Sequence, residues 1–277
     1  MKSRRRSRKK KTVSNPLTQF FVATLCVALL LAIGYHYRNG LAYYFSFKTD
    51  KVLKNKETKQ LSGVRNFNVL SVYQDKAVGI DVSEYQGEID WKQVRFVENN
   101  FPIHFTFIRA TVGKDKVDHQ FETNWKAANE NLIRGAYHYY RPNENSLKQA
   151  ELFIRNVKLK PGDLPPVLDI EVVPREQSMD RLKVGLKRWL QKVTLHYKTK
   201  PIIYTNEKFY EAFLKEEFGE YPFWIANYNF FVEEMQDDWL LWQFTEKGTV
   251  SGIDGNVDVN LFNGTPEMLQ HLAASRN

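Results

Sequence analysis

Short apolar runs alternate with amphipathic segments from residue 76 onward. The short runs are rich in β-branched and aromatic residues, which predicts buried strands. In the segments between them, apolar residues recur every three or four positions, which predicts helices with one buried face. The predicted strands lie at 77–83, 105–111, 133–140, 164–172 and 201–205. The first predicted helix follows a cap at Asp90 and places Trp91, Val94 and Val97 on one face. The next helices are predicted at 121–131, at 146–157, after a cap at Ser178, and at 207–217.

The last third of the chain has a different pattern. Strands are predicted at 222–226, 239–244 and 256–261, but the segments between them lack helical periodicity, and 249–255 is a glycine-rich loop typical of a hairpin. Alternating strands and helices imply a parallel sheet with right-handed crossovers. Eight strands favour closure into a (β/α) barrel with an irregular last third, and an open doubly wound sheet is the alternative. We assign residues 76–265 to this domain and 266–277 to a C-terminal tail.

The amino terminus predicts a membrane anchor. Residues 12–37 contain no charged side chain and are long enough to cross a bilayer as a helix. Residues 1–11 are strongly basic, which favours the cytoplasmic side of the membrane. We therefore expect a cytoplasmic tail at 1–11, a single uncleaved transmembrane helix at 12–37, a stalk at 38–75, and an extracytoplasmic domain at the cell inner membrane. A cleaved signal peptide is the alternative.

Charge and cysteine content narrow the classes of partner. The eight lysines and arginines within residues 1–11 equal the whole formal net charge of +8, so the rest of the chain is neutral. The high isoelectric point therefore describes a tail, and we predict no nucleic-acid partner. The single cysteine, Cys26, lies in the predicted anchor. The domain that follows needs no disulfide in any compartment.

Two acidic residues end the predicted strand at 164–172. Side chains alternate along a strand, so Asp169 and Glu171 share one face. Burying acids there costs several kcal/mol unless they are paired or neutralised. One interpretation is an acid/base pair in which mutual repulsion raises one pKa, so that one carboxyl keeps its proton near neutral pH. The other is a partly exposed strand end whose acids bond to loop amides or to an arginine.

Further candidates lie near the ends of other strands. Asp81 and Asp258 join Asp169 and Glu171 at strand ends that we expect to meet on one rim of the barrel. Aromatic rings beside carboxylates suit the apolar faces of sugars, and amides suit sugar hydroxyl or acetamido groups. The aromatic candidates are Tyr85, Tyr137, Tyr139, Trp224, Tyr228 and Trp242, and the amide candidates are Gln86, Asn227 and Gln243.

Other chemistries fit the sequence poorly. It contains no phosphate-binding glycine loop, no dinucleotide fingerprint, no zinc-protease motif and no nucleophile elbow. The histidines show no ligand spacing, so we predict no metal site and no cofactor. A site for a hard cation made only of carboxylates remains the alternative.

An ordered set of motifs carries a family resemblance. The motifs are Gly79-Ile80-Asp81-Val82-Ser83-Glu84-Tyr85-Gln86-Gly87, Asp90-Trp91, Phe107-Ile108-Arg109-Ala110-Thr111, Gly135-Ala136-Tyr137-His138-Tyr139-Tyr140, Leu168-Asp169-Ile170-Glu171, Ile203-Tyr204-Thr205, Trp242-Gln243-Phe244 and Gly252-Ile253-Asp254-Gly255-Asn256-Val257-Asp258-Val259-Asn260. In order and spacing, this set resembles the family 25 glycoside hydrolases, the Chalaropsis-type lysozymes. The resemblance spans roughly residues 76 to 264.

The resemblance implies a fold and an activity. The fold is an irregular (β/α)5β3 TIM-like barrel, and the activity is N-acetylmuramidase cleavage of the β-1,4 bond between N-acetylmuramic acid and N-acetylglucosamine in peptidoglycan. It places the proton donor at Glu171 with Asp169 beside it, and puts Asp81 and Asp258 in the same acidic site. We expect a monomer that acts on peptidoglycan glycan strands. The alternatives are a non-catalytic module that tethers the membrane to peptidoglycan, and a metal-dependent hydrolase.

Overall fold

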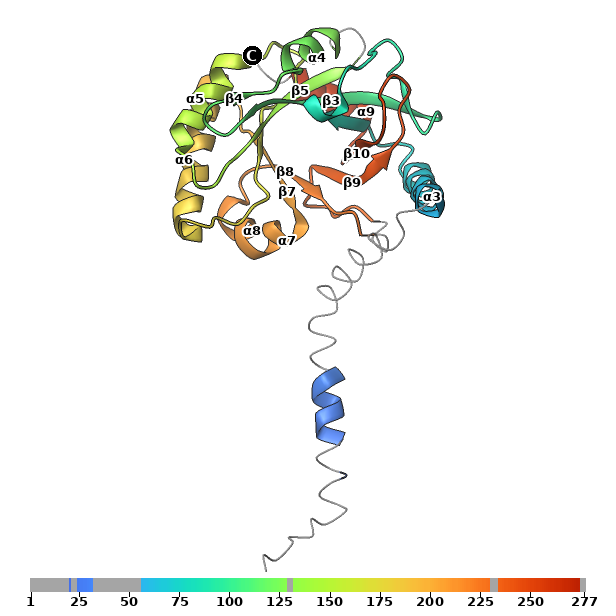
Figure 1. Ribbon diagram of the computed structural model, residues 1–277, viewed down its shortest axis with the longest axis vertical. Coiled ribbons are helices and arrows are strands. Elements are labelled where there is room, and N and C mark those ends of the chain that lie inside the picture. Colours follow the sequence, from blue (N-terminus) through green and yellow to red (C-terminus); the bar gives the residue numbers. More distant parts are fainter. Residues whose placement is uncertain (1–19, 21–23, 32–55, 129–131, 230–233, 275–277) are drawn as a thin grey trace, which may run out of the picture. The chain divides into compact units, whose positions relative to one another are not determined.

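The strands predicted after residue 76 close into a barrel in the computed structural model, which describes residues 20, 24–31, 56–128, 132–229 and 234–274. The chain divides into two units, Met1–Lys54 and Asn55–Asn277, and the barrel belongs to the second. Its eight strands are β1 (Val78–Val82), β3 (Phe101–Val112), β5 (Ile133–Tyr139), β6 (Val167–Asp169), β7 (Ile202–Asn206), β8 (Phe223–Ala226), β9 (Leu241–Gly248) and β10 (Val257–Phe262) (Figure 1).

The strand order shows how the barrel closes. From β1 through β9 each barrel strand runs parallel to the next one along the chain, whereas β10 runs antiparallel to both of its neighbours, β9 and β1. Because β1 pairs with β3 on one side and with β10 on the other, the sheet has no open edge between them. The predicted mixed α/β barrel is confirmed, and the open doubly wound sheet is wrong.

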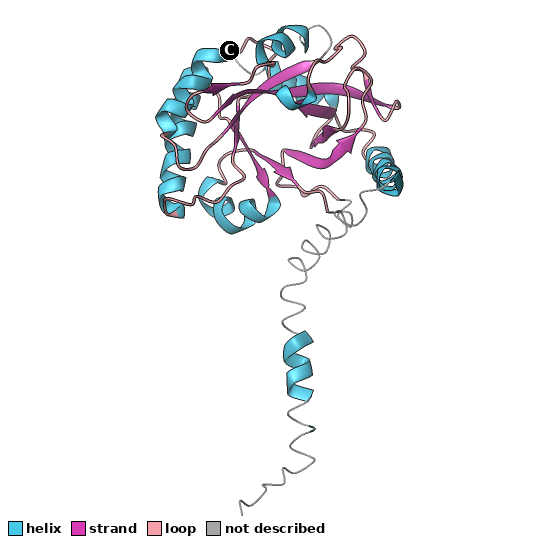
Figure 2. Cartoon of the chain, viewed as in Figure 1, coloured by secondary structure: helices cyan, strands magenta, loops and turns pink. Residues whose placement is uncertain are grey.

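Helices cover the outside of the barrel (Figure 2). They are α4 (Phe121–Ala127), α5 (Ser146–Asn156), α6 (Met179–Tyr197), α7 (Glu207–Phe209) and α8 (Lys215–Phe218), with a π-helical turn at Tyr210–Leu214 between the last two. The predicted cap of α6 is confirmed, because the Ser178 hydroxyl accepts a hydrogen bond from the amide of Arg181.

The first strand–helix unit differs from its prediction. No helix follows Asp90; instead a 3-10 turn, η1 (Glu84–Gln86), leads to the short strand β2 (Phe96–Val97), which pairs with the start of β3. The Asp90 carboxylate bonds to the amide of Lys92 and to the side chain of Gln93, which favours a turn over a helix. Trp91, Val94 and Val97 are buried as the spacing predicted, but they are buried from an irregular segment.

Both flanks of the predicted domain also belong to the folded unit. Helix α3 (Lys56–Val72) falls in the segment predicted as a stalk, yet Val69 and Leu70 are buried. Helix α9 (Pro266–Ala274) falls in the segment predicted as a tail, yet Leu269 and Ala273 join the apolar core inside the barrel. The folded unit therefore extends beyond 76–265 on both sides, because short apolar pairs dock these helices.

The barrel interior holds a core of aromatic and aliphatic side chains. Phe105 and Phe107 from β3 lie within it, and their rings occupy the space that a side chain at Gly79 or Gly135 would need. A second, larger apolar layer fills the space between the strands and the outer helices. The inner core fills the interior beneath the rim, so it leaves the carboxyl ends of the parallel strands as the place for a cleft.

The predicted anchor falls mostly outside the described residues. Within residues 12–37 the structure describes only Phe20 and residues 24–31, and these are helical. Across the described part of the chain, no helix combines the length and apolar character needed to span a bilayer.

Candidate active site

A cleft of about 220 Å³ opens at the carboxyl ends of the parallel strands. All four acids predicted from the sequence line it. The lining residues are Asp81, Val82, Ser83, Tyr85, Gln86, Arg109, Tyr137, Tyr139, Asp169, Glu171, Tyr204, Trp224 and Asp258. The structure therefore brings the four acids together on one rim, as the sequence predicted.

Asp81 and Asp258 form one half of the acidic cluster. They are register partners on β1 and β10. The sequence interpretation put Asp258 at a carboxyl end, but Asp258 is the second residue of β10, and it reaches the rim because β10 runs antiparallel. Oδ2 of Asp81 accepts hydrogen bonds from Nε2 of Gln243 at 2.7 Å and from Nδ2 of Asn260 at 2.9 Å.

Burial separates the protonation states of this pair. Burial raises the pKa of Asp81 to about 6, against the opposing effect of its hydrogen bonds from Asn260 and Gln243. Burial, together with the charge of Asp81, raises the pKa of Asp258 to about 9. At neutral pH Asp258 therefore keeps its proton, whereas Asp81 is mostly ionised.

Asp169 and Glu171 form the other half. Asp169 is the last residue of β6, and Glu171 lies two positions further on. Burial, then the charges of Glu171 and Asp81, raises the pKa of Asp169 well above its usual value, while Arg109 opposes this rise. Burial and the charge of Asp81 raise the pKa of Glu171. Oδ1 of Asp169 is buried and accepts no hydrogen bond from an amide or a cation among the described residues, which favours the acid/base interpretation over neutralisation by loop amides.

Aromatic side chains form the walls of the cleft. The predicted Tyr137, Tyr139 and Trp224 line it, as does Tyr204, which the sequence interpretation did not select. The Tyr204 hydroxyl donates to Oε1 of Gln243 at 2.7 Å, so the other end of that amide faces Asp81. Tyr204 shares the inward face of β7 with Ile202, which strand alternation indicates.

Asn260 is a second residue that the sequence interpretation missed. It lies two residues after Asp258 on the same face of β10, and Nε1 of Trp224 donates to its Oδ1 at 2.9 Å. This contact fixes the orientation of the amide, so that Nδ2 of Asn260 faces Asp81. The signal was present in the sequence, since alternate residues of a strand share a face.

Three predicted binding residues from the last third have different positions. Trp242 points away from the cleft: its side chain is fully buried in the outer layer, and Nε1 donates to the backbone oxygen of Asn227. The side chain of Asn227 bonds to Glu207 and to the amide of Asn229, so it stabilises a loop. Tyr228 is 43% exposed, and its hydroxyl donates to Gln243.

The two predicted residues of η1 lie at the cleft. Tyr85 is 79% exposed and lies against the Arg109 guanidinium, 4.6 Å from the ring centroid. Gln86 lines the cleft, but its Oε1 accepts the amide of Ser83 in a capping box, so it also has a structural role.

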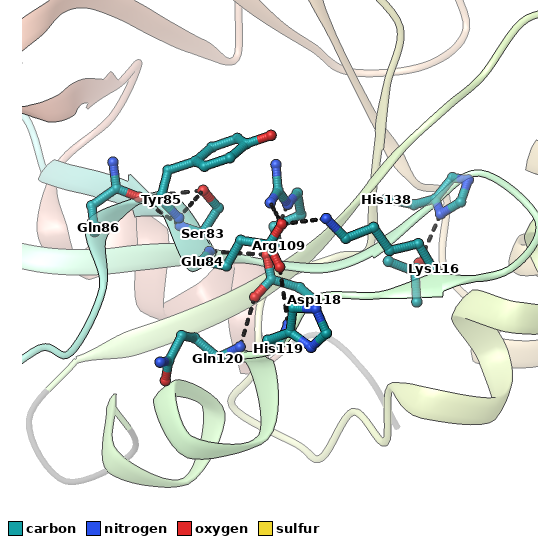
Figure 3. Close-up of polar contacts among 11 residues, drawn as sticks. Ser83, Glu84, Tyr85, Gln86, Arg109, Lys116, Asp118, His119, Gln120 and His138 are labelled. Atoms are coloured by element: carbon teal, nitrogen blue, oxygen red, sulfur yellow. Dashed lines mark hydrogen bonds and ion pairs between the residues drawn. The ribbon is translucent and has the colours of Figure 1, made fainter.

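Arg109 lines the cleft and also belongs to a paired network of charges, made up of Glu84, Arg109, Lys116 and Asp118 (Figure 3). It lies near the carboxyl end of β3, with Nε donating to Oδ2 of Asp118 at 2.8 Å and Nη2 lying 3.1 Å from Oε1 of Glu84. Glu84 also pairs with Lys116, which is the main reason that the pKa of Glu84 is lowered. Among the described residues that line the cleft, Arg109 is the one lysine or arginine.

No group of side chains suited to holding a metal ion occurs in the part of the chain that the structure describes. The four carboxyls of the cleft are instead adjacent to amides, hydroxyls and Arg109. A proton on some carboxyls and a charge on others is what carboxyl-based hydrolysis of a glycosidic bond requires.

Comparison with known proteins agrees with this chemistry. Residues 80–253 match the sequence model of the glycosyl hydrolases family 25. The chain belongs to glycosyl hydrolase family 25. Within this family it is 42% identical to protein YegX of Escherichia coli (strain K12) over 197 residues, which cover 69% of this chain and 71% of YegX.

Two relatives of this family 25 hydrolase are named as lysozymes. Lysozyme M1 of Streptomyces globisporus is 34% identical over 211 residues, covering 70% of each chain. The crystal structure of the bacterial lysozyme from Streptomyces coelicolor superimposes with a TM-score of 0.65 at 30% identity, covering 73% of this chain and 98% of that chain. The chain is thus a glycoside hydrolase homologous to lysozymes.

Proposed function

We propose that this family 25 hydrolase is a peptidoglycan muramidase that cleaves the β-1,4 bond between N-acetylmuramic acid and N-acetylglucosamine. The observation that carries the proposal is the meeting of Asp81, Asp169, Glu171 and Asp258 in one cleft. The lysozymes among its relatives point to the same class of substrate. Aromatic walls beside the acids suit the apolar faces of a glycan strand.

The two halves of the cluster have different roles in this proposal. Glu171, whose pKa is raised by burial and by Asp81, protonates the glycosidic oxygen as general acid. Asp169 stabilises the oxocarbenium-like transition state, either through the acetamido group of the substrate or as a direct nucleophile. Asp81 holds the proton on Glu171 through its charge, and Asp258 orients Asp81.

We propose net retention of anomeric configuration, with participation of the acetamido group. Substrate-assisted enzymes are known among glycosidases that retain configuration with one essential acid. The anomeric form of the first product, followed by proton NMR during turnover, tests this. An inverted product contradicts it.

The muramidase activity itself is tested on purified peptidoglycan. The full chain in detergent is incubated with the glycan, and the products are reduced with borohydride and identified by mass spectrometry. We expect reduced ends at muramic acid, and none from the Glu171→Gln variant. Intact glycan that co-sediments with the protein contradicts the activity and favours a module that tethers the membrane to peptidoglycan.

We further propose that residues 12–37 anchor the enzyme in the inner membrane, with residues 1–11 cytoplasmic and the catalytic unit outside. The uncharged sequence supports this, as do the exposed apolar side chains of the helical residues, such as Leu25, Leu30 and Leu31. Alkaline extraction and protease treatment of spheroplasts test it. Release of the protein by alkali, or protection of the catalytic unit from protease, contradicts the proposal.

A further inference from the structure

Helix α3 is an addition to the part of the chain that matches the family. The match begins at residue 80, whereas α3 ends at Val72. Figure 1 shows α3 on the outside of the barrel beside β9. Its buried face contains two polar residues, Arg65 (7% exposed) and Asn66 (fully buried), in addition to Val69 and Leu70. Burial of an arginine needs compensating hydrogen bonds, so its partners indicate what the helix does.

Arg65 holds two backbone segments at once. Nη1 donates to the carbonyl oxygen of Phe244 at 2.5 Å, and Nη2 donates to the carbonyl oxygen of Asn229 at 3.2 Å. A planar guanidinium can bridge two acceptors in this way, whereas a lysine ammonium is a single point charge. The partners are distant in sequence, one on β9 and the other in the loop after β8.

Each of these carbonyls is next in sequence to a residue of the hydrogen-bond chain that ends on Asp81. Phe244 follows Gln243, and Asn229 follows Tyr228. The hydroxyl of Tyr228 donates to Oε1 of Gln243, and Nε2 of Gln243 donates to Oδ2 of Asp81 at 2.7 Å. Arg65 therefore fixes the distance between two backbone segments whose side chains, Tyr228 and Gln243, bond to each other, with Gln243 in turn bonded to Asp81.

A second contact holds the same loop. The Tyr73 hydroxyl, just beyond α3, accepts the amide of Met235 at 2.9 Å. Asn229 and Met235 are thus each bonded from the α3 side. Two separate contacts on one loop are more than burial of α3 alone requires.

We propose that Arg65 is a positioning residue, which keeps Gln243 and Tyr228 in the register that lets Gln243 donate to the Asp81 carboxylate. Through this contact α3 sets the pH range of catalysis. This inference rests on the proposed muramidase function only for its activity readout, since the protonation of Asp81 can be followed without substrate.

The expected direction follows from the charges around Asp81. The titratable groups that face it are Tyr137 from β5, Asp169 and Glu171 at the end of β6, Tyr204 from β7, Tyr228 after β8 and Asp258 from β10, with Arg109 of β3 as the neighbouring cation. The hydrogen bond from Gln243 lowers the pKa of Asp81. Weakening that bond therefore raises the pKa of Asp81, and the acidic limb of the pH profile moves to higher pH.

The test compares Arg65→Ala and Arg65→Lys with Asn66→Ala in the full chain in detergent. Asn66 is the matched control, because it is equally buried on α3 and bonds to Glu98 and to the Lys247 carbonyl, neither of which lines the cleft. The readouts are the pH profile of kcat/KM on peptidoglycan, the titration of the Asp81 carboxyl by ¹³C NMR, and the thermal midpoint.

We expect Arg65→Ala to move the acidic limb of the kcat/KM profile to higher pH by about half a pH unit, and to raise the pKa of Asp81 measured by NMR by the same amount. Arg65→Lys should give a smaller rise in the same direction, and Asn66→Ala should lower the thermal midpoint without moving either pKa. Equal shifts in the Arg65 and Asn66 variants, or none in either, overturn the inference and leave α3 a structural helix. If Arg65→Ala does not fold, the Arg65→Lys titration decides. If the wild type fails to cleave peptidoglycan, the proposed function fails, while the Asp81 titration still tests the role of Arg65.

Discussion

Two groups of acids lie at one barrel rim, and they differ in the number of cations beside them. Glu84 and Asp118 surround Arg109, and the pKa of Glu84 is lowered because Lys116 and Arg109 stabilise its charge. The second group consists of the four cleft acids, whose pKa values are all raised, chiefly by burial.

The difference teaches what keeps a proton on an acid in this fold. The side chains are of the same kind, and each group combines buried and half-buried acids. A cation beside an acid favours its charged form, as at Glu84, whereas grouping four acids near a single arginine favours keeping protons on some of them. Variants that remove an acid or a cation from either group test this comparison.

The largest effect is expected at Glu171. Glu171→Gln keeps the size of the side chain but removes the transferable proton, so kcat/KM on peptidoglycan should fall by about 10²–10⁴-fold without loss of stability. Glu176→Gln is the matched control, because Glu176 is exposed in the same loop. If Glu171→Gln keeps turnover close to wild type, Glu171 is not the general acid.

Removing Arg109 should be the largest change in stability. Arg109→Leu leaves two acids without their buried cation, and breaking a buried pair in this way typically costs about 3–5 kcal/mol. The pKa of Asp169 should rise as well, since Arg109 opposes its increase. Urea unfolding measures the first effect; a loss below about 1 kcal/mol would show that solvent replaces the arginine.

Asp258→Asn should have an effect that depends on pH. Because the pKa of Asp258 is raised to about 9, the folded state binds a proton that the unfolded state releases above about pH 4. The free energy of unfolding therefore falls as pH rises between these values, by up to about 1.4 kcal/mol per pH unit. The variant should remove this part of the slope and be the more stable protein at alkaline pH. Parallel stability curves for the two proteins contradict the assignment.

The smallest effect is expected at the exposed edge of the paired network. Lys116 has a side chain that is 37% exposed, so Lys116→Met should change stability by at most about 1 kcal/mol, and less at high salt. The pKa of Glu84 should nevertheless rise, because Lys116 is its main stabilising partner. A salt-independent loss of stability would place Lys116 in the buried part of the network.

The acids and the alternation of strands and helices were predictable because each depends on local sequence. Asp169 and Glu171 follow an apolar run, and the periodicity after Ser178 gave a helix with the right start. Orientation was harder to predict. Trp242 and Gln243 were both predicted to bind substrate, although neighbours in a strand point to opposite faces, and the structure places only Gln243 inward.

Features that depend on distant contacts were not predictable from the pattern. Helix α3 has weak apolar periodicity, and its docking depends on Arg65 finding carbonyls more than 160 residues away in sequence. The hairpin-like loop at 249–255 indicated that β10 runs back along β9, but the pairing of β10 with β1, which brings Asp258 beside Asp81, depends on barrel closure and has no local signal. Arg109 was present in a recognised motif, but its partners come from η1 and from the segment after β4 (Lys116–Val117).

Closure of the barrel through β1 and β10 has a consequence for biosynthesis. Asp81 is translated before Gln243, Asp258 and Asn260, which hold or face its carboxylate and lie more than 160 residues later in the chain. A nascent or truncated chain that lacks β10 has neither the closed sheet nor the complete acidic cluster. The acidic cluster of this hydrolase is therefore completed only after the whole domain has been translated, so unfinished chains lack the complete site.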